Sequence, residues 1–385
     1  MDLDASPNKK VKILICRSNP VAPDPRVEKE ARSLSQGGYS VQILGWDRTG
    51  GLPEHEDLGW AQINRQSIRS RFARGLMNFF PLLRWQMHLL VWLVRHRKDY
   101  DILHACDFDT ILPALVCKKI FHKKLIYDIF DFYADHLRAT PASLKRLIRL
   151  VDVWVIGQVD ALILVDEQRI EQIAGAHPKR LAVIYNTPED VWPELASQPT
   201  DDNSIHLVYV GLVQIERGLL DILEVMRRHP VWKLDLAGFG GDEQQILQAC
   251  KDLQNVTWHG RVPYETALSL SSQANVLVAL YDPRIENHRY ASPNKIFEAM
   301  LLAKPVIVAR HTNMDRIIEQ AGSGLVIDYG DVDALEAALM RLEKDPLLRQ
   351  RLGQSGRRAY EQKYSWRVME RRLLDVYHEI QSVPV

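Results

Sequence analysis

The fold is decided by the stretch Ser292-Pro293-Asn294-Lys295-Ile296-Phe297-Glu298-Ala299-Met300 and its continuation Lys304-Pro305-Val306-Ile307-Val308-Ala309. We expect a short helix here, with Ser292 as its N-cap and Pro293 at its first position, because a hydroxyl and a proline suit those two places. Pro305 ends the helix, and residues 306–309 are typical of a strand that is covered on both faces. A capped helix followed by a buried strand is the repeating unit of an α/β fold.

The start of this helix is also a candidate anion site. Free backbone N–H groups and the helix dipole favour a phosphate at a helix N-terminus. Lys295 adds a cation in the first turn, and Glu298 places a carboxylate one turn further along, where it suits sugar hydroxyls beside a diphosphate. The same residues are compatible with an ordinary capped helix that binds no ligand.

Length and composition indicate a globular protein of two domains. The chain has 385 residues, of which 46% are hydrophobic and 25% are charged. The formal net charge is zero, so no overall field favours nucleic acid. The four cysteines lack the spacing of metal ligands, and we expect reduced thiols. A polar N-terminus without a signal-peptide core, and an apolar stretch 79–94 broken by Arg84, Gln86 and His88, predict a cytoplasmic protein.

Strand and helix patterns alternate along the chain, which predicts two doubly wound Rossmann-like domains that face a cleft. We expect one domain at 1–190, a second at 204–364, and a C-terminal helix at 365–385 that packs back toward the first domain. The segment 186–203 is rich in Pro, Asp and Ser and is typical of a linker. The predicted strands are 11–16, 39–44, 102–104, 124–127, 161–165 and 181–184, then 206–210, 233–236, 256–258, 276–280, 306–309 and 324–327.

Five short motifs follow one another in the second half. They are Tyr209-Val210-Gly211, Arg217-Gly218-Leu219, Leu236-Ala237-Gly238-Phe239-Gly240, Val256-Thr257-Trp258-His259-Gly260-Arg261-Val262 and the stretch from Ser292 to Met300. In this order and spacing the sequence resembles the family 4 glycosyltransferases of GT-B fold, in the subgroup with Ser-Pro-Asn-Lys before the last motif helix. The resemblance covers nearly the whole chain. It implies sugar transfer from a nucleotide diphosphate with retention of anomeric configuration, and neither a metal nor another cofactor.

The resemblance places the donor site in the second domain. It implies that Arg217 and Lys295 hold the diphosphate, that the backbone of Arg261 and Val262 meets the base, and that Glu298 hydrogen-bonds the ribose. A guanidinium can grip a diphosphate with two bonds, and glycines allow close backbone approach. The predicted donor-site residues are Gly211, Arg217, Gly238, Gly240, Arg261, Val262, Ser292, Asn294, Lys295 and Glu298, of which Arg217 and Lys295 are also expected to be catalytic.

Two positions depart from the family pattern. The first glutamate of the family's paired signature would fall on Tyr290, and an arginine after the first glycine would fall on Leu212. Arg289 and Lys295 flank the same loop and would compensate for the missing contacts. The departures put the identity of the sugar in doubt more than the fold.

The first half supplies candidate acceptor residues. Arg26 follows the helix cap Asp24 and either offers a cation to the cleft or is a surface arginine. His104 is either catalytic or a satisfied buried histidine. Asp107 at a strand end is an active-site candidate, and its Asp-x-Asp motif is not expected to bind metal, because no other ligands accompany it.

Asp128 and Asp131 surround Phe130, which stands where relatives often have a sugar-contacting histidine. Either aspartate would stabilise charge near the anomeric carbon. A retaining enzyme without an obvious nucleophile is usually assigned a front-face path, in which the leaving diphosphate helps to remove the acceptor's proton. No separate general base is then required.

The segment from Ala61 to Lys98 contains no Asp or Glu but eight Lys or Arg, interleaved with large apolar residues. Such a segment can lie on an anionic bilayer, or it can be a helix pair with a solvated basic side. We expect the first, which would place the protein at the inner face of the cell membrane. The interleaved residues are Phe72, Leu76, Phe79, Phe80, Trp85, Leu89 and Trp92.

The sequence therefore predicts a retaining glycosyltransferase that uses a nucleotide sugar, a UDP-hexose such as UDP-glucose above all, and builds a polysaccharide or glycolipid. The acceptor would be a glycan or a lipid-linked molecule. A non-hydrolysing sugar-nucleotide epimerase shares the architecture and is the alternative. A sugar-nucleotide-binding subunit without catalysis is a further one, which Tyr290, Leu212 and Phe130 keep open.

Overall fold

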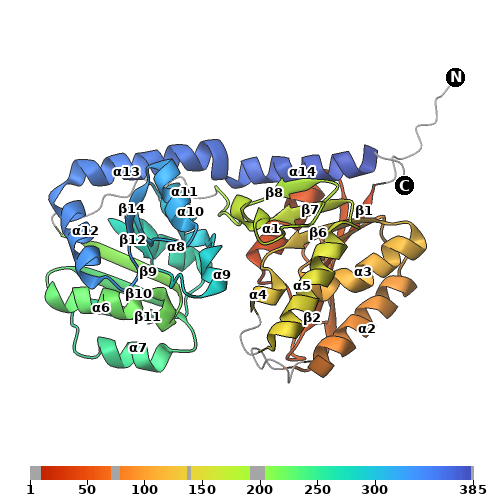
Figure 1. The fold of residues 1–385 in the computed structure, drawn as a ribbon, viewed down its shortest axis with the longest axis horizontal. Coiled ribbons are helices and arrows are strands. Elements are labelled where there is room, and N and C mark those ends of the chain that lie inside the picture. Colours follow the sequence, from red (N-terminus) through yellow and green to blue (C-terminus); the bar gives the residue numbers. More distant parts are fainter. Residues whose placement is uncertain (1–9, 71–78, 137–139, 191–203, 383–385) are drawn as a thin grey trace. The chain divides into compact units, whose positions relative to one another are not determined.

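The computed structural model describes residues 10–70, 79–136, 140–190 and 204–382, and these form two α/β units (Figure 1). The first unit comprises the described parts of Met1–Tyr185 and Met369–Val385, and the second comprises those of Asn186–Val368. Each unit is built on one mainly parallel sheet with helices on its faces. The prediction of two doubly wound Rossmann-like domains is confirmed.

The first unit has an eight-stranded sheet in the order β3-β4-β2-β1-β5-β6-β7-β8. All neighbouring pairs are parallel except β3 and β4, which run antiparallel. Continuous apolar runs such as that of β5, where every residue is buried, are typical of parallel strands with both faces covered. The strands are β1 Lys12–Arg17, β2 Ser40–Asp47, β3 His55–Asp57, β4 Gln62–Ser67, β5 Ile102–Cys106, β6 Lys124–Ile129, β7 Ala161–Leu164 and β8 Leu181–Val183.

Helices cover both faces of this sheet. Side chains alternate between the faces of a strand, so Leu14 and Cys16 of β1 join the core beneath α2, α3 and α5. His104 of β5 points to the other face, where its imidazole meets Tyr377 of α14. The helices of this unit are α1 Pro25–Gln36, α2 Phe79–Arg95, α3 Phe108–Phe121, α4 Tyr133–His136, α5 Ala142–Ile156 and α14 Trp366–Ser382, with a 3-10 turn at Glu167–Ile170.

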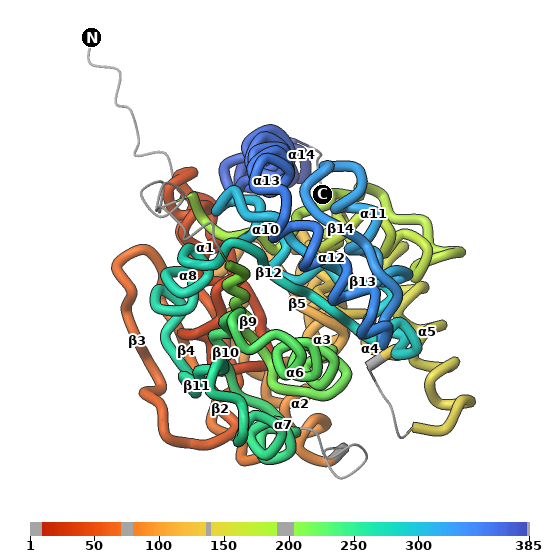
Figure 2. The backbone as a smooth tube through the Cα atoms, turned by 90° about the vertical axis from the view of Figure 1, so that its left-hand side faces the viewer, coloured from red at the N-terminus to blue at the C-terminus, as the bar shows by residue number. Residues whose placement is uncertain are grey.

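The second unit has a six-stranded parallel sheet in the order β11-β10-β9-β12-β13-β14. Its strands are β9 His206–Leu212, β10 Lys233–Phe239, β11 Val256–Gly260, β12 Val276–Ala279, β13 Val306–Ala309 and β14 Gly324–Ile327. Its helices are α6 Leu219–Arg228, α7 Glu243–Cys250, α8 Tyr264–Gln273, α9 Glu286–Arg289, α10 Asn294–Leu301, α11 Met314–Ala321, α12 Val332–Lys344 and α13 Pro346–Ala359. Figure 2 shows α6 between α7 and α12, and α6 contacts both. A 3-10 turn at Ile215–Arg217 precedes α6, and a π-helical turn at Tyr360–Tyr364 follows α13.

One local prediction is wrong. Helix α10 begins at Asn294, so Pro293 rather than Ser292 occupies the cap position, and no side chain caps the helix. The acid-free segment from Ala61 begins with strand β4, in which Ile63 and Arg65 alternate with more exposed polar residues and face the protein interior. Most of the predicted linker, residues 191–203, lies outside the described residues.

Candidate functional site

The candidate donor site begins where β9 and β10 end side by side. Gly211 of β9 pairs with Gly238 of β10, and their φ angles of 150° and 152° lie in a region that side chains disfavour. A Cβ at Gly238 would overlap the carbonyl oxygen of Gly211, and a Cβ at Gly240 would overlap Val213. These glycines therefore let two strand ends and the loop after them pack together, which shapes the floor of the site.

Two cations gather above this floor. Arg217 lies at the end of the 3-10 turn, and its guanidinium carbon is 3.7 Å from the ring centroid of Tyr281. Lys295, in the first turn of α10, places Nζ 3.9 Å from the ring centroid of Tyr209 and 5.8 Å from that of Tyr281. A Cβ added to Gly211 would sit 3.0 Å from this Nζ, so glycine leaves room for the ammonium. Aromatic faces attract cations, and both rings therefore hold the cations in place.

The electrostatics of this pair favour an anion. Burial, together with the charge of Arg217, lowers the pKa of Lys295 to about 7, although Glu298 opposes the shift. Within the described residues, Nε and Nη1 of Arg217 are buried without a hydrogen-bond partner, as are Ser292 Oγ and Asn294 Oδ1. Buried polar groups without partners are costly. A diphosphate that accepted the guanidinium and ammonium hydrogens would satisfy both cations.

The remaining predicted donor residues lie on neighbouring elements. Glu298 follows Lys295 by one turn and hydrogen-bonds to the phenol of Tyr264 at the start of α8. Arg261 is exposed, with its guanidinium carbon 4.6 Å from the ring centroid of Phe239, and Val262 comes next in the loop before α8. Glu298 thus lies one turn after Lys295 on α10, while Arg217 reaches the same site from the 3-10 turn before α6, an arrangement that suits a ligand with a diphosphate and sugar hydroxyls.

In the first unit, Asp107 terminates β5 in an unusual backbone conformation, with φ 63° and ψ 170°. Its Oδ1 accepts the backbone N–H of Phe130 at 2.9 Å, and its other oxygen pairs with Arg17. Burial raises the pKa of Asp107 to about 6 against the opposing charge of Arg17. Arg17 also pairs with Asp24 at 2.9 Å and lies 4.1 Å from the ring centroid of Phe130.

Asp131 follows two residues after β6 and is the most exposed of the three candidate aspartates. Its carboxylate is 44% exposed and pairs with Arg169 at 3.0 Å. Its backbone N–H is 3.4 Å from Asp107 Oδ1, so the connections that follow β5 and β6 lie side by side. This leaves Asp131 with oxygen atoms that solvent, and hence a substrate, can reach.

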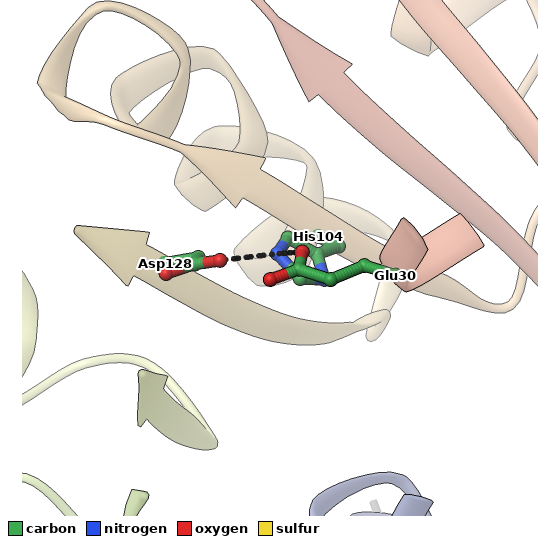
Figure 3. Close-up of side chains that lie close together, drawn as sticks. All are labelled: Glu30, His104 and Asp128. Atoms are coloured by element: carbon green, nitrogen blue, oxygen red, sulfur yellow. Dashed lines mark ion pairs between the residues drawn. The ribbon is translucent and has the colours of Figure 1, made fainter. Parts of the chain in front are cut away.

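Asp128, by contrast, lies inside a buried polar cluster with Glu30 and His104, shown in Figure 3. The Arg26 guanidinium donates to both oxygens of Asp128 at 3.0 Å and contacts Glu30 at 3.1 Å. His104 Nδ1 lies 2.7 Å from the Tyr377 hydroxyl, and Nε2 lies 3.4 Å from Asp128.

These contacts bear on the alternatives for two residues. Arg26 is 3% exposed and its guanidinium faces Asp128 and Glu30, so it is neither a surface arginine nor a cation that is turned to a ligand. His104 is buried with a partner for Nδ1, whereas its Nε2 makes no regular hydrogen bond among the described residues.

The same cluster has the composition of a metal site, because ligand atoms of Glu30, His104 and Asp128 lie within 4.8 Å of one another. The guanidinium of Arg26 already faces both carboxylates, and a metal ion would have to displace it.

The electrostatics of the cluster shift the pKa values of its two carboxyl groups in opposite directions. Burial raises the pKa of Glu30 to about 7. Burial acts in the same direction on Asp128, but Arg26 and His104 outweigh it, and the pKa of Asp128 falls. Because its residues come from α1, β5 and β6, and His104 contacts Tyr377, the cluster connects these three elements with α14.

Comparisons with known proteins agree on fold and reaction class. The structure superposes on a sucrose-phosphate synthase from Thermosynechococcus elongatus with a TM-score of 0.79 and 16% identity, covering 97% of this chain and all of that one. Residues 26–187 match the family model described as Glycosyltransferase Family 4, and residues 190–359 match the one described as Glycosyl transferases group 1. The chain is a glycosyltransferase of the GT-B type.

This glycosyltransferase is 22% identical over 289 residues to a glycogen synthase of Mycobacterium tuberculosis, covering 72% of this chain and 68% of that protein. It is 25% identical over 305 residues to the GDP-mannose:cellobiosyl-diphosphopolyprenol alpha-mannosyltransferase of Xanthomonas oryzae, covering 74% of this chain and 76% of that protein. The structure of Anabaena HepE in complex with UDP and glucose superposes with a TM-score of 0.70 and 13% identity, covering 97% of this chain and 100% of that one. No helix among the described residues is long and apolar enough to cross a membrane.

Sequence reasoning missed three side chains of the glycosyltransferase's candidate sites. Tyr209 and Tyr281 hold the cations, and Arg17 pairs with Asp107. Tyr281 stands just beyond the carboxyl end of β12, where ligands bind in such sheets, and that position was the available signal; Tyr209 lies in the middle of β9 and gave no such signal. Arg289, expected to compensate for a missing cation, is exposed at the end of α9.

Proposed function

We propose that this glycosyltransferase transfers a hexose from a nucleotide diphosphate, a UDP-hexose such as UDP-glucose, to a polysaccharide or glycolipid acceptor with retention of configuration. The observation that carries the proposal is the pair Arg217 and Lys295, two cations held on tyrosine rings, of which Arg217 has two buried nitrogens that lack hydrogen-bond partners among the described residues. Such a pair fits a diphosphate better than an uncharged ligand.

The chemistry follows from where charge develops. The bond between the anomeric carbon and the diphosphate breaks, and a bond from the acceptor hydroxyl oxygen forms on the same face of the sugar. The acceptor's proton passes to the departing phosphate oxygen, so the balance needs no added base. Arg217 and Lys295 stabilise the negative charge on the leaving diphosphate, a role that removes the need for a metal ion. Glu298 then holds the ribose.

The first unit supplies the acceptor side in this proposal. Asp131 is the aspartate assigned to charge stabilisation, because Asp128 is buried and paired with Arg26. Asp107 shapes the loop that carries Asp131. Relatives are named as enzymes that use GDP-mannose with a lipid-linked acceptor, and as a glycogen synthase, which supports a glycan or lipid-linked acceptor.

The test combines binding with product analysis. Calorimetry with UDP-glucose, GDP-mannose and uridine should show that the diphosphate sugars bind and that uridine binds far more weakly. Arg217→Ala should weaken UDP-glucose binding roughly 10- to 100-fold, the range for lost charge-assisted bonds, and leave uridine nearly unchanged. Arg351→Ala, which alters an exposed arginine of α13 in the same unit, is the matched control.

Incubation with donor, with and without a chelator, then identifies the reaction. Release of UDP with an α-linked product or α-hexose by NMR supports retaining transfer, and equal rates with the chelator support metal independence. A new epimer of the donor would establish the epimerase instead. Saturable binding without any turnover across donors and acceptors would establish the binding subunit.

A further inference from the structure

The outer side of three helices of the first unit carries an unusual number of exposed apolar side chains. Helices α2, α3 and α5 lie side by side on one face of the sheet (Figure 1), and α3 contacts the other two. Phe80 is 76% exposed, Leu150 60% and Trp154 57%. The outward apolar residues are Phe80, Leu83, Met87 and Val91 on α2, Val116 and Ile120 on α3, and Leu144, Leu147, Leu150 and Trp154 on α5. We call these residues the apolar face.

Helix α2 is apolar on two opposite sides. Trp85, Leu89 and Leu93 are fully buried and pack in the core at a spacing of four residues. The outward set 83, 87 and 91 is offset from them by two residues, which is roughly 200° around a helix. A helix that covers one core usually presents polar residues to solvent on its other side. On α2, by contrast, Leu83, Met87 and Val91 are all exposed.

Helix α5 repeats the arrangement. Val155 and Ile156 are buried, together with Asp152, whereas Leu147, Leu150 and Trp154 point away from the core. Outward apolar residues on three adjacent helices make one broad surface rather than scattered single residues. Broad apolar surfaces of this kind mark contacts with proteins or membranes.

The exposed charges on these three helices all have one sign. The two carboxylates within the three helices, Asp109 of α3 and Asp152 of α5, are buried. The cations include exposed Arg84 and Arg95 on α2, exposed Lys119 on α3 and exposed Arg146 on α5. Over the described lengths of these helices the outer side thus combines apolar residues with positive charge and presents no carboxylate. This is the composition that binds an anionic bilayer surface.

A second copy of the chain fits the face less well. A symmetric dimer places the same patch on both sides of its interface, so cations of one copy would meet cations of the other. Like charges brought together oppose association. Anionic lipid headgroups supply the opposite charge, and acyl chains accept the apolar side chains.

The surface differs from the one expected from the sequence. Within the segment 61–98, residues 62–67 form strand β4, residues 71–78 lie outside the described residues, and Trp85 and Leu89 belong to the core. Among the residues of that segment that the structure describes, only the outer side of α2 contributes. Helices α3 and α5, which the acid-free segment does not include, supply the rest.

We propose that the apolar face of α2, α3 and α5 docks the protein on an anionic lipid bilayer, with Leu147, Leu150 and Trp154 entering the interface. This goes beyond sugar transfer and does not depend on which donor the enzyme uses. The three helices lie in one unit, so the surface is complete within it.

The test is co-sedimentation with vesicles of phosphatidylcholine and phosphatidylglycerol, and with vesicles of phosphatidylcholine alone. The protein should sediment with the anionic vesicles, and binding should fall as salt rises, because headgroup attraction is screened over about 10 Å near 0.1 M salt. Leu147→Glu should weaken binding roughly ten-fold or more, by losing the burial of one large apolar side chain and adding a repelled charge. Leu347→Glu, at a 70% exposed leucine of α13 in the other unit, should bind as the parent does.

A second readout reports insertion directly. Brominated phosphatidylcholine in the anionic vesicles should quench part of the tryptophan fluorescence, and Trp154→Phe should abolish that quenched part while it still sediments. Parent-like sedimentation of Leu147→Glu, or no sedimentation of the parent with anionic vesicles, would overturn the proposal. A parent dimer in light scattering that Leu147→Glu converts to a monomer would also overturn it, because the face would then join two copies. None of these three results would bear on donor binding, which calorimetry measures separately.

Discussion

Lys295 should make donor binding depend on pH. Burial and the charge of Arg217 lower its pKa to about 7 in the unliganded protein, from an ordinary value of 10.5. A bound diphosphate would favour the charged ammonium and raise that pKa again. Binding then requires a proton on Lys295, and above about pH 7 that proton must be taken up from solution.

The magnitude follows from this linkage. Each pH unit above a pKa of about 7 weakens binding by roughly ten-fold while Lys295 stays protonated in the complex. Between about pH 7 and about pH 9 the dissociation constant for UDP-glucose should therefore rise roughly 50-fold, which corresponds to about 2 kcal/mol. UDP-glucose is the suitable ligand because its diphosphate has no terminal phosphate group that titrates near neutral pH.

Calorimetry across this pH range is the assay, with three variants. Lys295→Arg should keep affinity and lose the pH dependence, since a guanidinium stays charged. Lys295→Met should bind weakly at every pH. Lys233→Met, at an exposed lysine of β10, should behave as the parent. A flat pH profile in the parent, or an unchanged slope in Lys295→Arg, would refute the assignment of the diphosphate to Lys295.

Three further outcomes are expected. Glu298→Ala should weaken UDP-glucose binding by about 1.5–3 kcal/mol in calorimetry, the range for hydrogen bonds to a charged group, and unchanged affinity in a folded variant would remove Glu298 from the donor site. Gly238→Ala should destabilise the second unit by roughly 3 kcal/mol or more, because its Cβ would overlap Gly211 in a disfavoured backbone region, and thermal unfolding measures this. Burial raises the pKa of Glu30 from 4.5 to about 7, so its protonation stabilises the fold at low pH and that contribution is lost as pH rises through about 7. Glu30→Gln should remove this part of the pH dependence, and urea unfolding at about pH 5 and about pH 8 should show a smaller difference between the two conditions than in the parent.

The apolar strands and the α/β repeat were predictable from the sequence because local composition decides them. Residues 306–309, for example, form β13 as expected, between two helices. Strand β4 was not predictable from its polar residues, since it depends on its pairing with β2. The cap of α10 was misplaced by one residue, an ambiguity that helix boundaries commonly carry.

The candidate site was predictable in part for the same reason. The motif residues Arg217 and Lys295 do come together, and their positive charges in these motifs were enough to predict a diphosphate site. The contacts of Tyr209 and Tyr281 with these cations were not, because an aromatic residue in or just after an apolar strand also fits a core position. The burial of Arg26 against Asp128 joins residues 102 positions apart, and no local pattern reveals such a contact.

The first unit draws on both ends of the chain, and this constrains the order in which it can fold during synthesis. The backbone N–H of Tyr185 donates to the sulfur of Met369 at 3.2 Å, and the hydroxyl of Tyr377 contacts the buried imidazole of His104. His104 and Tyr377 are 273 positions apart in the sequence, so the ribosome makes β5 long before it makes Tyr377. The second unit is continuous in sequence and can complete its core first. Until α14 emerges, His104 lacks its Tyr377 partner and the nascent first unit cannot complete the packing on that face of its sheet.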